Sequence, residues 1–352
     1  MDATIATTAT GEQPLVELLE RAGVAHPVLV DRARRELEVT LRATRASKIG
    51  ELAWRASCLT PSRYPVEVAV TSARAELRTV VDVVAPEGDR GTAFATALDL
   101  ADSLGAPGLP PDARRLIDAH QRGLPLRFGA WLGSRHDLAG TRHKVYVETG
   151  AQADAWRLVD ELAPDARRVL SDLGPIRMLG LPLDGSGSVE VYVRPSELHA
   201  ETLGACLGRA GLEHFAARMS AAMAGGTAAE LRGRNHVVSA FVRGGAVVAV
   251  AGFTFAHQRH RHDRRVRDRM LDLAVTERWP SLGLYESVSR PLAAPRPMRR
   301  PLHTALSEVA TRGADTLEHH IGLAPPPLGA DDMSVGTDRF RDHNGERNGV
   351  RS

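Results

Sequence analysis

The stretch RHKVYVE, residues Arg142–Glu148, alternates polar and apolar side chains and carries one of only two lysines among the 45 Lys and Arg residues of the chain. In a β-strand, successive side chains point to opposite faces, so Lys144 and Tyr146 share one face and the valines share the other. Arginine supplies nearly every other positive charge. A lysine next to a tyrosine on one strand face therefore indicates a specialised position.

A second stretch repeats this pattern. In SVEVYVR, residues Ser188–Arg194, Glu190 stands two residues before Tyr192, and valines again fill the alternate positions. A sheet with one face on helices and the other in water also alternates in this way. Because charged groups and tyrosines share the polar face in both stretches, we favour strands whose polar faces line an enclosed site.

Pairs of strand-like runs recur between helical runs about every 50–65 residues, a period typical of repeat architectures. The second pair is expected to turn between Gly133 and Gly140, and the third around Asp184–Gly187, where glycines allow the positive φ of a tight turn. The strand pairs cover residues 65–84, 126–148, 176–194, 236–255 and 303–323. Helical periodicity covers residues 30–41, 92–104, 112–122, 151–162, 197–207, 212–223 and 264–273.

Strands joined by hairpins are antiparallel, and closing such a sheet on itself removes its unpaired edges. The sequence thus predicts an α+β fold: a ten-stranded antiparallel β-barrel built from five αββα repeats and surrounded by a ring of helices. We expect a flexible N-terminus at residues 1–13, the barrel domain at 14–324 and a disordered tail at 325–352, which is poor in apolar residues. Valines would face the helices, and the polar face would line an internal chamber.

Composition narrows the class of protein. With 43% hydrophobic residues and a formal charge of +2, the chain can build a large core and shows no strong nucleic-acid footprint. Cys58 and Cys206 have no disulfide or metal-site spacing, which fits a reducing cytoplasm. Neither a signal peptide nor a run of about 18 apolar residues is present. We expect a soluble cytoplasmic protein, a monomer or weak homodimer, with no membrane or nucleic-acid partner.

Three segments resemble the ABBA-type aromatic prenyltransferases, whose fold is called the PT barrel. Tyr64–Val70 followed by Leu77–Val80 is similar to the first hairpin of the indole, or dimethylallyltryptophan synthase, branch, where Pro-x-Glu precedes an arginine on the next strand. His143–Tyr146 resembles the second hairpin, and Ile176–Tyr192 resembles the third. The likeness extends diffusely over residues 14–324.

This resemblance implies transfer of a prenyl group from dimethylallyl or geranyl diphosphate to an aromatic acceptor, such as an indole or tryptophan derivative, in secondary metabolism and natural product biosynthesis. The richness of the chain in Ala, Arg and Gly indicates a bacterial source with high genomic G+C content. It implies diphosphate binding by Arg78, Lys144 and Tyr146, with Arg234 as a further cation. Departure of a diphosphate requires cations and hydroxyl groups that stabilise its charge away from water.

The resemblance also implies how the allyl cation and the released proton are handled. Tyr146 and Tyr192 would stabilise the cation through their ring faces, and Glu67 would accept a proton from the acceptor. No cofactor is required, although Mg²⁺ would be compatible with the chemistry, and no protein metal site is predicted. Further side chains expected to line the chamber are Asp82, Glu190, Arg194, His319 and His320.

Some positions depart from the family pattern. Glu190 stands where a further diphosphate ligand is expected, and a carboxylate there would repel the substrate unless it pairs with Lys144 or Arg194 or helps to bind a metal. His319 and His320 are adjacent, so at most one of them can enter the chamber.

Three functions therefore remain open: a prenyltransferase, a PT-barrel enzyme with other acid–base chemistry such as a cyclase or isomerase, and a catalytically silent ligand-binding barrel. The first requires at least three basic groups converging in the chamber.

Overall fold

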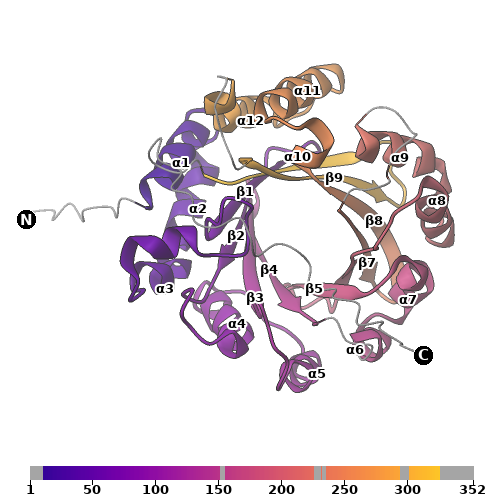
Figure 1. The fold of residues 1–352 in the computed structure, drawn as a ribbon, viewed down its shortest axis with the longest axis horizontal. Helices are drawn as coiled ribbons and strands as arrows, with labels where there is room; N and C mark the ends of the chain where they lie inside the picture. The colour runs from indigo at the N-terminus through magenta and orange to yellow at the C-terminus, as the bar shows by residue number, and fades with distance from the viewer. Residues whose placement is uncertain (1–10, 151–154, 226–230, 232–234, 294–300, 326–352) are drawn as a thin grey trace, which may run out of the picture.

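Ten antiparallel strands close into a barrel around which the helices form a ring (Figure 1). The structure, a computed structural model, describes residues 11–150, 155–225, 231, 235–293 and 301–325. Arg234 and most of the two terminal segments discussed above lie outside the described residues. The strands are β1 (Val66–Thr71), β2 (Leu77–Asp82), β3 (Ala130–Asp137), β4 (Gly140–Glu148), β5 (Ile176–Pro182), β6 (Val189–Val193), β7 (His236–Arg243), β8 (Ala246–Phe255), β9 (His303–Thr311) and β10 (Glu318–Leu323).

Each strand pairs with its neighbours in sequence, and β1 pairs with β10 to complete the closure, with Val68 opposite Leu323 and Thr71 opposite His320. The predicted ten-stranded antiparallel barrel is confirmed. Short connections join the two strands of each hairpin at one end of the barrel, which we call the hairpin end. Helical segments connect successive hairpins at the opposite end, which we call the helix end.

The helices cover the outside of the barrel. They are α1 (Gln13–Ala25), α2 (Pro27–Thr40), α3 (Arg42–Arg45), α4 (Ala93–Ser103), α5 (Pro111–Gln121), α6 (Ala155–Leu162), α7 (Pro164–Leu170), α8 (Ala200–Arg209), α9 (Ala216–Ala224), α10 (Ala256–His260), α11 (Asp263–Thr276) and α12 (Leu282–Ser289), with 3₁₀ turns η1 (Gly50–Arg55), η2 (Arg90–Thr92), η3 (Ser171–Leu173), η4 (Glu213–Phe215) and η5 (Arg290–Leu292). The sequence did not predict α1, α7 or α12, nor the short helices α3 and α10. α1 and α7 both begin with a proline in the first turn, where its missing N–H costs nothing.

The hydrophobic core lies between the barrel and the helices, and not inside the barrel. Val66, Val68 and Val70 of β1 are each 0% exposed and pack in the cluster that includes residues of α1, α2 and α12. Each such valine contributes about 1.5–3 kcal/mol by leaving water. Glu67 and Ala69, which alternate with these valines, border the barrel interior. Because side chains alternate along each strand, the apolar ones pack against the helices and the ones between them face the barrel interior.

The second hairpin differs from the prediction. β3 continues through Gly133 to Asp137, so the turn occupies only the residues between Asp137 and Gly140. Gly133 is a strand residue with a packing role, because a Cβ there would lie 2.8 Å from Cε2 of Tyr146. The glycine that the sequence analysis assigned to a turn is therefore needed for another reason, namely that a neighbouring side chain lies close to the strand backbone.

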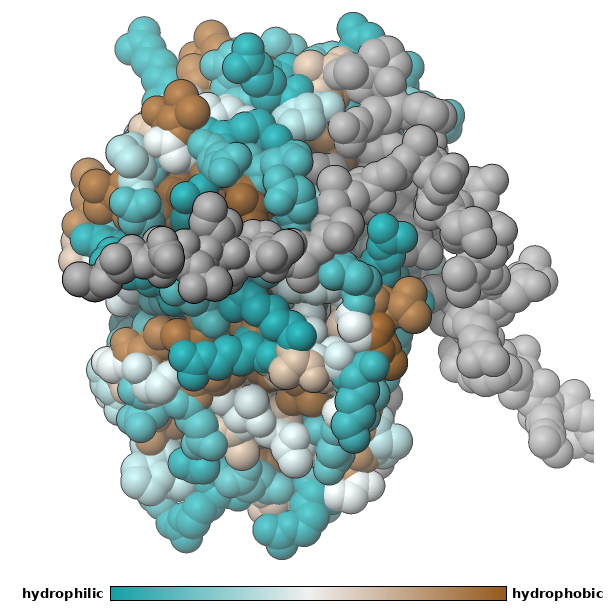
Figure 2. All heavy atoms as spheres, turned by 90° about the vertical axis from the view of Figure 1, so that its left-hand side faces the viewer, coloured by the Kyte–Doolittle hydropathy of each residue, from teal (hydrophilic) through white to brown (hydrophobic). Residues whose placement is uncertain are grey.

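Within the described ranges, no helix combines the length and apolar character needed to cross a bilayer. On the face seen in Figure 2, polar residues predominate and apolar ones form small separate patches. Cys58 and Cys206 are both free thiols, and Cys206 is buried.

Candidate active site in the barrel

A cavity of about 120 Å³ lies inside the barrel and is lined mainly from β1–β4 and β8–β10. Glu67, Arg78, Lys144, Tyr146 and His320 all border it. Five of the residues chosen from the sequence therefore meet in one space, although the first and last are more than 250 positions apart in the chain. Ligand pockets usually measure about 300–1,000 Å³, so two substrates would have to move some of these side chains.

Lys144 is the centre of a buried polar cluster. Its ammonium group forms an ion pair with Glu190 and donates a hydrogen bond to Tyr192 Oη at 3.3 Å, and Ser239 donates to the other oxygen of Glu190. Burial alone would raise the pKa of Glu190, but Lys144 and the hydrogen bonds outweigh it and lower the pKa to about 2. The charged carboxylate is therefore the stable form, and it neutralises Lys144.

Glycines make room for this lysine. Gly133 and Gly180 flank the Lys144–Tyr146 segment on the two adjacent strands. A Cβ on Gly180 would stand 2.3 Å from Cε of Lys144. The side chain can cross β5 to reach Glu190 on β6 because position 180 has no side chain.

Aromatic rings surround the same ammonium group. Lys144 Nζ lies 5.0 Å from the ring centre of Tyr146, 5.6 Å from that of Tyr192 and 6.0 Å from that of Phe241. Tyr192 also contacts Tyr146 and Phe253, with ring centres 6.1 Å and 5.7 Å away. The two predicted tyrosines are thus joined by two phenylalanines in a surface that can stabilise a cation.

Glu67 is the acid on the β1 side of the cavity. Burial raises its pKa above the ordinary value, and no residue of the described chain forms an ion pair with it. Gly322 on β10 faces it closely, since a Cβ there would lie 3.1 Å from Glu67 Cδ and 2.2 Å from Thr304 Oγ1. The pairing of β9 with β10 contains a β-bulge at this position, where the side chains of Glu67 and Thr304 lie close to the backbone of Gly322. A carboxyl with a raised pKa is a stronger base once ionised.

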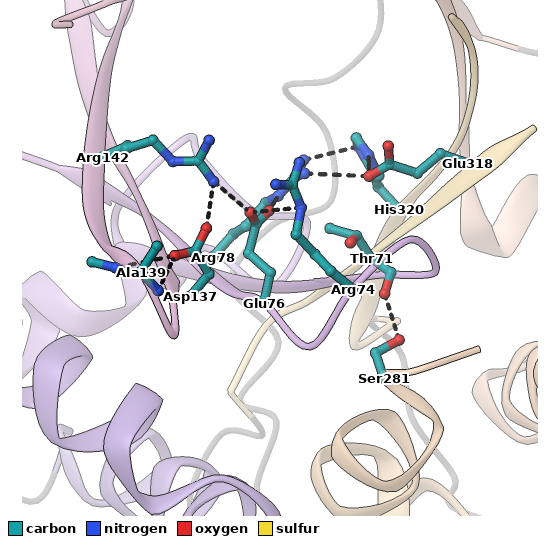
Figure 3. Close-up of polar contacts among 11 residues, drawn as sticks. Thr71, Arg74, Glu76, Arg78, Asp137, Ala139, Arg142, Ser281, Glu318 and His320 are labelled. Atoms are coloured by element: carbon teal, nitrogen blue, oxygen red, sulfur yellow. Dashed lines mark hydrogen bonds and ion pairs between the residues drawn. The ribbon is translucent and has the colours of Figure 1, made fainter. Parts of the chain in front are cut away.

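Arg78 is held by three protein groups near the hairpin end (Figure 3). Its Nε pairs with Glu76, Nη1 donates to Nδ1 of His320 at 3.0 Å, and Nη2 lies 3.5 Å from Glu318. Burial and the charge of Arg78 lower the pKa of His320 to about 4, so the imidazole is neutral and its Nε2 donates to Glu318 at 2.8 Å. The guanidinium is therefore fixed in orientation and largely charge-balanced.

Rim arginines share the same acid. Arg142 contacts Glu76 at 3.1 Å and Asp137 at 2.6 Å, and Arg74 contacts Glu76 at 3.4 Å (Figure 3). Burial would raise the pKa of Glu76, but Arg78, Arg135 and the other arginines lower it. Glu76 acts as the shared counter-ion of the rim.

Arg135 is the chamber residue that sequence reasoning missed. It lies on β3, directly opposite Arg78 of β2, and lines the cavity. Burial lowers its pKa, but nearby Tyr146, Glu76 and Glu190 more than compensate, so it remains charged. The prediction of a turn at residues 133–140 hid it. The alternation Trp131-x-Gly133-x-Arg135 could have placed it on the inner face.

Other predicted residues lie away from the cavity. His319 points outward, where its ring stacks on Trp279 at 5.3 Å and approaches Glu277 at 3.5 Å, so its prediction as a chamber residue was wrong. Strand alternation gave the inner place to His320 alone.

Asp82 and Arg194 lie at the helix end and do not line the cavity. Asp82 accepts hydrogen bonds from Ser57 at 2.9 Å and from Arg90 at 2.7 Å, and Arg194 donates to Asn235 at 2.8 Å. In the described parts of the chain, no three His, Cys, Asp or Glu side chains come together as metal ligands.

A second positive region lies at the helix end. Burial, together with the charges of Arg194 and Arg127, lowers the pKa of Arg177 on β5, and Glu148 counters this effect. One oxygen of Glu148 is already engaged, because its Oε2 accepts from the backbone N–H groups of residues 127, 128 and 129. Arg177, Arg127 and Arg194 thus bring cationic groups together at the helix end, with Glu148 as a nearby carboxylate.

Solved structures of other proteins share this barrel architecture. The apo prenyltransferase PriB superposes with a TM-score of 0.72 at 19% identity, covering 91% of this chain and 99% of that chain. The chain has the PT-barrel fold. The 5-dimethylallyl tryptophan synthase from Streptomyces coelicolor, solved in complex with DMASPP and Trp, matches with a TM-score of 0.73 at 17% identity, covering 94% and 99% of the two chains.

A further PT-barrel match is the 6-dimethylallyltryptophan synthase from Micromonospora olivasterospora, also in complex with DMASPP and Trp, with a TM-score of 0.70, 18% identity and 90% and 97% coverage. The resemblance seen in the sequence is thus confirmed at the level of the fold. No protein-family model matches the sequence, and no curated protein matches it.

Proposed function

We propose that this PT-barrel protein is an aromatic prenyltransferase that transfers an allylic group from dimethylallyl or geranyl diphosphate to an indole-type acceptor. One observation carries the proposal: Arg78, Arg135 and Lys144 line a single cavity together with Tyr146 and Glu67. Three basic groups in one water-poor space are what diphosphate departure requires. The matched tryptophan synthases in complex with DMASPP and Trp support the same substrate classes.

The reaction would proceed in three steps. The C–O bond between the allyl group and the diphosphate breaks first. Arg78 and Arg135 stabilise the departing anion, together with hydrogen bonds from Lys144 and Tyr146. The allyl cation is held against Tyr146, Tyr192 and Phe253 until the electron-rich ring of the acceptor attacks it. Glu67 then takes the proton that the acceptor ring loses, which restores aromaticity.

The acceptor is best described as an indole that carries a carboxylate. Arg177, with Arg127 and Arg194 nearby, offers guanidinium groups at the helix end, opposite the arginines of the hairpin end. A tryptophan-like acceptor would place its carboxylate there and its ring near Glu67. We propose that the enzyme acts in the secondary metabolism of a bacterial cytoplasm and requires no cofactor, since basic side chains supply the positive charge.

The test is a product assay. The protein is incubated with dimethylallyl or geranyl diphosphate and a panel of indoles, tryptophan derivatives and phenols, with and without EDTA, and prenyl adducts are sought by mass spectrometry. Adducts with an indole, formed equally in EDTA, are expected. Absence of adducts across the panel would overturn the proposal, and adducts only with Mg²⁺ would overturn its cofactor-free part.

A second candidate is favoured by one specific observation. Glu190 holds Lys144 in an ion pair where a further diphosphate ligand was expected. A cyclase or isomerase could use such paired acid and base groups without any diphosphate. It would be indicated by turnover of a prenylated aromatic compound in the absence of free diphosphate.

A further inference from the structure

Three arginines lie side by side on consecutive strands near the hairpin end. Arg78 of β2 is opposite Arg135 of β3, which is in turn opposite Arg142 of β4. The outer two are engaged: Arg78 with Glu76, Glu318 and His320, and Arg142 with Glu76 and Asp137. Arg135, between them, forms no hydrogen bond or ion pair with any residue that the structure describes.

The other cation of the chamber is also engaged. Lys144 is paired with Glu190 and is only 5% exposed. An anion that bound Lys144 would have to compete with a carboxylate that is already in contact with it. Arg135 involves no such competition, because it lines the cavity and no described residue forms a hydrogen bond or ion pair with it.

A charged group in the barrel interior without a partner is costly, and an incoming anion would remove that cost. The planar fork of a guanidinium also matches two oxygens of one phosphate group, a geometry that a lysine cannot provide. Glu76 and Glu190 stabilise the charge of Arg135 from a distance without occupying its donors.

We propose that Arg135 is the primary ligand of the substrate diphosphate, and that Lys144, neutralised by Glu190, has a secondary role. The inference rests on the proposed function and deepens it. It places the diphosphate toward β2 and β3, beside the neutral His320, and leaves the aromatic wall around Lys144 for the allyl group.

The experiment measures binding of inorganic pyrophosphate by isothermal titration calorimetry at low salt. Arg135→Gln is expected to weaken binding about tenfold to a hundredfold, the range for loss of charge-assisted hydrogen bonds. Arg135→Lys, which keeps the charge but not the fork, is expected to recover only part of that loss. Arg142→Gln is the matched control, because it removes the cross-strand neighbour with the same charge, and it should change affinity less than about threefold.

Each outcome is decisive. Wild-type affinity in Arg135→Gln, or an equal loss in Arg142→Gln, would overturn the role of Arg135 and leave the proposed function standing. A wild-type protein that binds no pyrophosphate and forms no prenyl adduct would overturn the proposed function itself. Circular dichroism and thermal unfolding of each variant separate a binding loss from a folding loss. If Arg135→Gln does not fold, Arg135→Lys decides the question, and wild-type affinity in that variant would contradict the need for the guanidinium fork.

Discussion

Glu190→Gln is expected to reduce the free energy of unfolding by about 3 kcal/mol at pH 7. The pKa of Glu190 falls from 4.5 to about 2 in the folded protein, and each pKa unit corresponds to about 1.4 kcal/mol. The value agrees with the loss of about 3–5 kcal/mol that follows when one partner of a buried ion pair is removed. Glutamine keeps the shape of the side chain but leaves the Lys144 charge buried without its counter-ion.

The stability difference between wild type and Glu190→Gln should change with pH in a predictable direction. A carboxyl whose pKa is depressed by folding stabilises the protein above its unfolded pKa, and that stabilisation is lost as pH falls toward the folded pKa. The difference between wild type and Glu190→Gln should therefore fall from about 3 kcal/mol at pH 7 to about 1 kcal/mol at pH 3.

The assay is urea unfolding of a double-mutant cycle made from Glu190→Gln, Lys144→Met and the double variant. The double variant should be about 3 kcal/mol more stable than the sum of the single losses predicts, because neither charge is left alone. Asp160→Asn is the control, since its ion pair with Arg167 is exposed and should contribute less than about 1 kcal/mol. Additive losses in the Lys144–Glu190 cycle would refute the pairing and make Lys144 a free diphosphate ligand.

Three further outcomes are expected. Glu67→Gln should lower turnover severalfold and leave pyrophosphate affinity near wild type, whereas a loss of affinity would point to a structural role. The same variant should raise thermal stability at pH 7, because a carboxyl with a raised pKa destabilises the folded state once it is ionised. The kcat of the wild-type enzyme should correspondingly rise with pH. His320→Ala should raise the KM for dimethylallyl diphosphate about threefold to tenfold, with partial rescue by His320→Asn, because Arg78 loses its 3.0 Å partner; an unchanged KM would contradict this positioning role. His303→Ala should cost about 3 kcal/mol in urea unfolding, because Tyr285 and Asp263 both lose a buried partner, and the loss should come without a specific change in the KM of the remaining folded enzyme.

The architecture was readable from the chain because it depends on local rules. Alternation at a period of two residues separates the valines from Lys144 and Tyr146, and glycine-containing turns mark the hairpins, so repeated hairpins predict an antiparallel barrel. The rule failed at Gly133, where a glycine needed for close approach to Tyr146 had the appearance of a turn residue. That single misplacement removed Arg135 from the predicted site.

The sequence by itself determined the barrel, its two faces and the inner position of Lys144, Tyr146, Glu67 and Arg78. Only the tertiary structure decided the partners: Lys144 reaches Glu190 across β5 because Gly180 leaves the space, and Arg78 contacts His320, which is 242 positions away along the chain. It also decided that His320 faces inward and His319 outward. Strand alternation assigns neighbouring residues to opposite faces of the sheet, but the register of the strands and the closure of the barrel decide which charged side chains come into contact. Those contacts in turn decide whether a cationic side chain is neutralised by a carboxylate or is free to bind a ligand.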